Sequence, residues 1–110
     1  MTGAQLFVSK REGVPFVYAV FRTARPLPRE GDIPDVLVVI GDRRETPQTL
    51  STRRPCYHAS ESLDDLGAPR FGQHLRVQLE LGNDREVVYD RRLTLRHERR
   101  GDRRGRRLGC

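Results

Sequence analysis

Tryptophan is absent from this chain, and lysine, methionine and cysteine are nearly so, with one lysine, one methionine and two cysteines in 110 residues. Two cysteines are too few for the disulfide framework that holds many small secreted domains. Cys110, at the end of the sequence, can pair with Cys56, with another chain or with nothing. The default expectation is therefore a protein in a reducing compartment.

Long apolar segments are also lacking. No hydrophobic run approaches the ~20 residues of a membrane span. Residues 1–5 show no basic stretch followed by an apolar one, so no signal peptide is visible. We therefore expect a soluble protein in the cytoplasm or elsewhere inside the cell, without a transmembrane segment.

Apolar residues are still numerous enough for one folded core. Leu, Ile, Val and Phe make up 28 of the 110 residues, which is above the roughly 20% below which a charged chain is expected to stay disordered. The length corresponds to a single domain. We expect that domain to occupy residues 1–96.

Basic charge is concentrated at one end of the sequence. Of the net charge of +6, residues 91–110 contribute +7 and residues 1–90 contribute −1. Such asymmetry indicates a segment that meets an acidic partner, or a solvated tail without one. Nearly all the basic residues are arginine; a GC-rich genome would produce the same bias, so the arginine count alone is no evidence of function.

Residues 14–23 predict a strand because aromatic and β-branched residues dominate them. Their side chains alternate between two apolar faces, one of Phe16, Tyr18 and Val20 and the other of Val17, Ala19 and Phe21. We expect such a strand to be covered on both sides. The apolar run at 36–40 predicts a buried central strand, and prolines in 24–35 predict a loop before it.

Residues 43–70 are the least informative, with short extended pieces expected at 49–52 and 56–58. A short helix is expected at 60–66, capped by Ser60 or Ser62 and closed by Gly67.

The clearest pattern follows at residues 74–96. Four apolar residues alternate with polar ones: Leu75, Val77, Leu79 and Leu81. Gly82-Asn83-Asp84 has turn chemistry, and a second alternating run returns over 86–96. Together they predict a β-hairpin with one buried face. Arg91 interrupts the second run and suggests a bulge there or the rim of the core.

These patterns predict a mainly β fold of four to six strands, either a small antiparallel sandwich or a partly open barrel, or an α+β fold with one short helix. Residues 97–110 hold one apolar side chain besides Cys110. We expect them to form a flexible, disordered arginine-rich tail, because they cannot offset the entropy of ordering.

No catalytic or metal site is expected. His58, His74 and His97 lie too far apart for metal-ligand spacing, and Cys56 with His58 alone is not a zinc site. Ribonuclease chemistry needs a base, an acid and a phosphate-holding arginine. The residue types for it are His58, His74, Glu80, Glu86 and Arg85. Ordinary solvated charges explain them better, so we expect no enzyme activity and no cofactor.

Two functions from different classes remain. The first is a non-enzymatic interaction domain that binds a protein partner or forms a homodimer through a β edge, with a basic tail for an acidic partner. The alternative is RNA or DNA binding through the tail, without sequence preference. The candidate binding residues are Arg91, Arg92, Arg96, Arg99, Arg100, Arg103, Arg104, Arg106 and Arg107, with Arg43, Arg44, Arg53 and Arg54 as auxiliaries.

Overall fold

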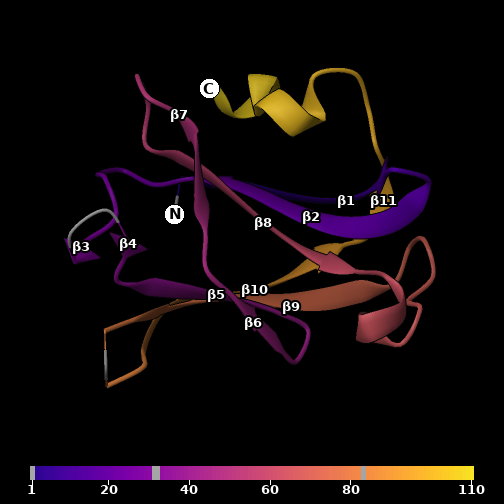
Figure 1. Ribbon diagram of the computed structural model, residues 1–110, viewed down its shortest axis with the longest axis horizontal. Coiled ribbons are helices and arrows are strands. Elements are labelled where there is room, and N and C mark those ends of the chain that lie inside the picture. Colours follow the sequence, from indigo (N-terminus) through magenta and orange to yellow (C-terminus); the bar gives the residue numbers. More distant parts are fainter. Residues whose placement is uncertain (1, 31–32, 83) are drawn as a thin grey trace.

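Two antiparallel-rich sheets face each other in the computed structural model (Figure 1), which describes residues 2–30, 33–82 and 84–110. The strands are β1 (Gly3–Arg11), β2 (Val14–Arg22), β3 (Arg29–Glu30), β4 (Ile33–Pro34), β5 (Val36–Ile40), β6 (Arg43–Glu45), β7 (Gln48–Ser51), β8 (Cys56–Ser62), β9 (His74–Leu81), β10 (Glu86–Thr94) and β11 (Arg96–His97). Three 3₁₀ turns accompany them: η1 (Asp64–Leu66), η2 (Asp102–Arg104) and η3 (Arg106–Leu108). The expectation of a mainly β fold is confirmed.

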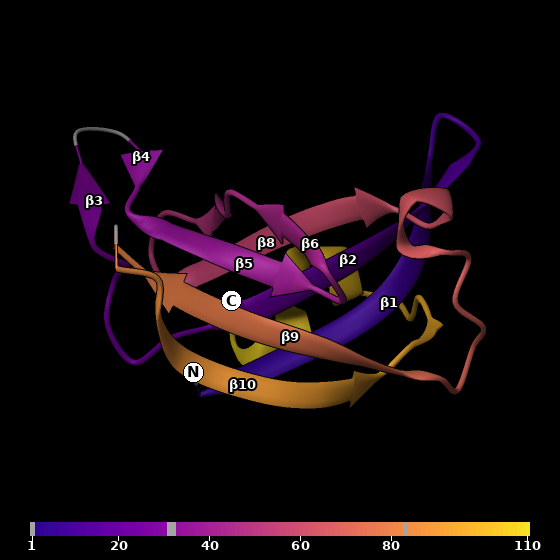
Figure 2. The ribbon, with the colours of Figure 1, turned by 90° about the horizontal axis from the view of Figure 1, so that it is seen from below.

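The five-stranded sheet has the order β11-β1-β2-β8-β7, and the four-stranded sheet has the order β10-β9-β5-β6. Neighbours pair antiparallel in both sheets, except that β11 runs parallel to β1. The described residues form no closed barrel. Figure 2 shows β10 along the outer margin of the four-stranded sheet, paired only with β9.

The main core lies between the two sheets. Its fully buried members include Val17 and Phe21 of β2, Val38 and Ile40 of β5, and Val77 of β9. The continuous apolar run of β5 is therefore a buried strand, as predicted, flanked by β9 and β6.

The predicted hairpin is confirmed, because β9 and β10 pair antiparallel over most of their length. Leu75, Val77, Leu79 and Leu81 all contribute to the main core. The bulge is not at Arg91: the register shifts between Val87 and Tyr89 instead. Asn83 of the predicted turn lies outside the described residues.

Several short elements carry no apolar period and were not predicted. β3 and β4 lie in the expected loop 24–35, and β6 is a three-residue strand. The expected helix at 60–66 is mostly strand, because β8 continues to Ser62. The turn η1 that follows has Leu63 as its N-cap residue, without a side-chain hydrogen bond, and Gly67 as its C-cap residue, in a left-handed conformation. The predicted closing residue is right and the predicted serine caps are wrong.

A second, smaller cluster lies on the outer face of the five-stranded sheet. Phe7, Tyr18 and Val20 are buried there, with Phe16, Leu50 and Leu108 packed against them. Both faces of β2 are thus covered, as its two apolar faces predict. Figure 1 shows the cover on this outer side: the chain after β11 folds back across the sheet.

Candidate anion-binding face

Residues 98–110, named here the C-terminal segment, form two consecutive 3₁₀ turns on the five-stranded sheet. Glycines separate the turns at intervals of four residues, at Gly101, Gly105 and Gly109, and each has a positive φ. Gly105 is buried, and a Cβ there would lie 2.9 Å from Cys110 Sγ and 3.0 Å from Leu50 Cδ2. The glycines therefore close turns and allow close packing. In this respect the structure differs from the flexible tail expected at 97–110.

Arginine side chains of β11 and of the C-terminal segment lie over aromatic rings of the sheet. The Arg96 guanidinium lies 5.7 Å from the centre of the Phe7 ring, and that of Arg103 lies 5.0 Å from the centre of the Tyr18 ring. Arg103 Nη2 also donates to Tyr18 Oη at 3.3 Å. Such cation–π contacts stabilise by about 0.5–1 kcal/mol when exposed and more when desolvated. These contacts stabilise the segment on the sheet, although the number of apolar residues in 97–110 gave no sign of them.

A buried carboxylate holds the segment from within. Asp102 is 0% exposed, and its two oxygens accept bonds from Arg96 Nη1 at 2.6 Å and Arg96 Nη2 at 3.2 Å. The Arg99 backbone N–H donates to the same carboxylate. Burial alone would raise the pKa of Asp102, but these donors and the nearby Arg107 outweigh it and hold the pKa below its ordinary value.

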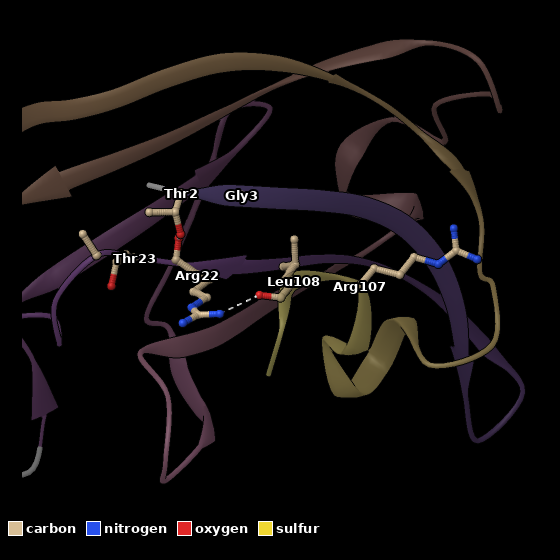
Figure 3. A pocket seen from close by; sticks show the side chains of 7 residues that line it. Thr2, Gly3, Arg22, Thr23, Arg107 and Leu108 are labelled. Carbon is tan, nitrogen blue, oxygen red and sulfur yellow. Dashed lines mark hydrogen bonds between the residues drawn. The ribbon is translucent and has the colours of Figure 1, made fainter.

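The far end of the segment is tied covalently to the sheet. Cys110 forms a disulfide with Cys56, the first residue of β8. Arg22 Nη1 donates to the Leu108 carbonyl at 3.1 Å, a bond visible in Figure 3. The hollow beside it measures about 400 Å³. Figure 3 shows Arg107 directed away from Arg22, so the two guanidinium groups of this hollow do not converge on one ligand.

Four arginines of the segment, Arg99, Arg100, Arg104 and Arg106, are exposed, and their side chains form no ion pair within the described chain. We call these four residues the cationic face. Arg99, Arg100 and Arg104 line a shallow hollow of about 390 Å³ together with Arg103 and one acid, Glu98. The segment that carries the turns η2 and η3 thus presents four positive charges without an ion-pair partner among the described residues.

A more enclosed cavity, the polar hollow, lies next to the cationic face and measures about 170 Å³. Five parts of the chain line it: the end of β1, β2, the end of β6 with the start of β7, β8, and η2. The lining residues are Arg11, Tyr18, Glu45, Thr46, Gln48, His58, Ala59, Ser60 and Arg103. Arg103 belongs to this hollow and to the wall of the shallow one.

Two groups in the polar hollow have shifted pKa values. Burial, and then the charge of Arg103, lower the pKa of His58, so its imidazole is neutral at pH 7. A hydrogen bond with Glu61, burial and the charge of Glu61 raise the pKa of Glu45 to about 7. Glu45 responds to Glu61 and Arg43, and His58 responds to Arg103.

The other predicted binding residues are scattered. Arg91 and Arg92 lie on β10 in the opposite sheet, exposed and away from the C-terminal segment. Arg44 of β6 is paired with Glu80 at 3.2 Å, and Arg43 Nε donates to the Asp65 carbonyl at 3.3 Å.

Arg53 and Arg54 lie nearer the segment, in the turn just before Cys56, beside a hollow of about 410 Å³. Seven of the nine arginines predicted in 91–107 lie in β11 or the C-terminal segment, and the other two lie in β10. Three of the seven already have partners: Arg96 and Arg107 pair with Asp102, and Arg103 donates to Tyr18.

The residues weighed for ribonuclease chemistry do not meet. His58 lies on β8 in the polar hollow, whereas His74, Glu80 and Glu86 lie on the β9–β10 hairpin of the other sheet. Glu80 is buried against Arg44, so it is not the solvated charge that its position on the polar face predicts. No group of three metal-binding side chains occurs in 2–30, 33–82 and 84–110.

No protein-family model, no curated protein and no solved structure matches this chain. In the part of the chain that the structure describes, none of the helical turns has the length or apolar composition to cross a bilayer.

Proposed function

We propose that the protein is a non-enzymatic binding domain that holds RNA or DNA by its phosphates through the cationic face, without reading the base sequence. One observation carries the proposal: four unpaired arginines stand on turns closed by glycines, a buried ion pair and a disulfide. Arginine suits phosphate because its planar fork of donors matches two phosphate oxygens.

Order in the segment supports this function over an inert tail. A flexible tail loses about 1–2 kcal/mol per residue when a partner orders its backbone, whereas the turns η2 and η3 are already formed. The segment has no aromatic residue, so base stacking is not available there.

A disulfide favours an oxidising compartment over the reducing one expected from the sequence, and the binding assay therefore uses oxidised protein.

The first prediction is a salt dependence. If the four arginines of the cationic face contact phosphates of duplex DNA, log K should fall with log salt concentration at a slope near about −3.6. The double variant R100Q/R104Q should reduce that slope to about −1.8. Fluorescence anisotropy with a labelled duplex over a series of salt concentrations measures both values.

A matched control is R70Q/R85Q, which removes the same charge from two exposed arginines outside the cationic face. This variant should keep the slope of the original protein, and duplexes of different sequence should bind alike. Equal loss of binding in both double variants would show that only net charge matters, and would overturn the assignment to this face.

A second candidate function, protein binding, rests on the free edge of β10. This strand pairs only with β9 among the described residues, and Val87 and Val88 are exposed by 48% and 47% at its bulge. An unpaired edge with exposed apolar side chains is a template for a further strand. We infer that a second copy of the chain pairs there.

The test of this homodimer is sedimentation of the full chain. The original protein should show a concentration-dependent dimer at tens of micromolar, and V88K should shift it to monomer, because lysine on an edge disfavours strand pairing. V14K is the control, since Val14 is equally exposed at 47% but lies at the β1–β2 turn. A monomer for the original protein at every concentration would exclude the edge as a dimer interface.

A further inference from the structure

The polar hollow places two guanidinium groups and a half-buried imidazole around one cavity of about 170 Å³. Its walls come from both ends of the chain and from the middle: Arg11 ends β1, His58 lies in β8, and Arg103 lies in η2. The C-terminal segment therefore completes this cavity when it docks on the sheet.

Aromatic rings hold each of these groups in place. The Arg11 guanidinium lies 4.0 Å from the centre of the Phe16 ring. The Tyr18 ring contacts Arg103 on one side, and it stacks with His58 at 6.5 Å between ring centres. Groups positioned in advance lose little entropy when a ligand arrives.

The charges in the hollow favour an anion. Neither Arg11 nor Arg103 has a carboxylate partner within 2–30, 33–82 and 84–110. The one carboxyl in the lining, that of Glu45, is hydrogen-bonded to Glu61 and has a pKa of about 7. The raised pKa lowers the negative charge that this carboxyl brings to the lining at neutral pH. Gln48, Ser60 and Thr46 add neutral hydrogen-bonding side chains.

We propose that the polar hollow binds the phosphate group of a phosphate monoester, held by Arg11 and Arg103 and by a proton on His58. A monoester carries close to two negative charges at neutral pH and three strong acceptor oxygens, which match two guanidinium groups. A phosphodiester inside a nucleic acid carries only one charge. The site does not depend on the proposed function, because the cationic face consists of other arginines.

Binding of an anion beside His58 must raise the pKa of its imidazole, because a negative neighbour favours the charged form. The experiment titrates the histidine ring resonances by NMR with and without inorganic phosphate, using the full oxidised chain. We expect phosphate to raise the pKa of His58, while His74 and His97, outside the hollow, change little.

Two variants test the two arginines separately. R11Q and R103Q should each weaken phosphate binding at least tenfold. R103Q also loses the contact with Tyr18, so R11Q, which leaves the C-terminal segment unchanged, gives an independent answer. The control is R70Q, since Arg70 is exposed but lines neither the polar hollow nor the cationic face. Phosphate binding that survives in both R11Q and R103Q would overturn the site.

The source of the phosphate group is resolved by two further ligands. A nucleoside monophosphate that binds as tightly as a 5′-phosphorylated oligonucleotide indicates a small free monoester as ligand. Tighter binding of the phosphorylated oligonucleotide, relative to the nucleotide and to the same oligonucleotide without its phosphate, indicates a nucleic-acid end. Equal binding of the two oligonucleotides, with no effect of R11Q, would contradict the proposal and leave the cationic face as the only binding surface.

Discussion

The Cys110→Ser variant is expected to lose about 4 kcal/mol of unfolding free energy. The disulfide joins residues separated by 54 positions, and closing a loop of this length removes a corresponding amount of entropy from the unfolded chain, about 4 kcal/mol on the chain-entropy model. The loss is measured by urea or guanidinium unfolding of both proteins without a reducing agent.

Reduction supplies the control for this variant. With dithiothreitol present, the original protein should lose the same stability and the difference between the two proteins should vanish. Equal stability of the two proteins under oxidising conditions would show that the Cys56–Cys110 bond does not constrain the chain.

Replacing Asp102 with asparagine is expected to cost about 3 kcal/mol. Asp102 is 0% exposed, and Arg96, which is 23% exposed, would lose its only carboxylate partner among the described residues. Breaking a buried ion pair at one partner costs about 3–5 kcal/mol, and the partial exposure of Arg96 places this case at the low end. The control is E98Q, an exposed acid of the same segment, which should change stability little.

The pH dependence of this pair has a definite sign. The pKa of Asp102 in the folded protein lies below its ordinary value of 3.8. The carboxylate therefore contributes its full stabilisation above pH 3.8 and loses it as the pH falls through the folded pKa. The stability gap between the original protein and D102N should close in acid below pH 3.8. A gap that stays constant from pH 7 to acid would contradict the ion pair.

The strands that sequence patterns predict best are those whose partners are close in sequence or whose two faces are unambiguous. The β9–β10 hairpin needs only a short turn and a period of two, and both are visible in the residues. β2 shows two apolar faces, which correctly predict cover on both sides. The short strands β3, β4 and β6 have no such period, because tertiary contacts determine them.

The docked arrangement of the C-terminal segment differs from the expected flexible tail for a physical reason. Its packing uses arginine on aromatic rings, a buried aspartate and a disulfide, and none of these adds to a count of apolar residues. Two signals were present in the sequence. No predicted element covered the second apolar face of β2, so another part of the chain had to pack there. Glycines also recur every fourth residue at 101, 105 and 109.

The two parts of the candidate site differ in how far the sequence predicts them. The exposed arginines of the cationic face are all within the predicted binding residues, because a run of like charge is visible directly. The polar hollow was not predicted, since its walls come from five parts of the chain. Of its lining, only Arg103 was assigned to binding, and Arg11 was not considered at all.

The covalent link between β8 and Cys110 also determines how the protein would respond to a pulling force on its two ends. Covalent tension would pass along the chain from β1 through β7 to Cys56 and then directly across the disulfide to Cys110. The β9–β10 hairpin lies inside the bypassed loop, so its backbone would carry none of this covalent tension. The fully stretched chain would be shorter by roughly 190 Å than a reduced chain, at about 3.5 Å per residue over the 54 positions.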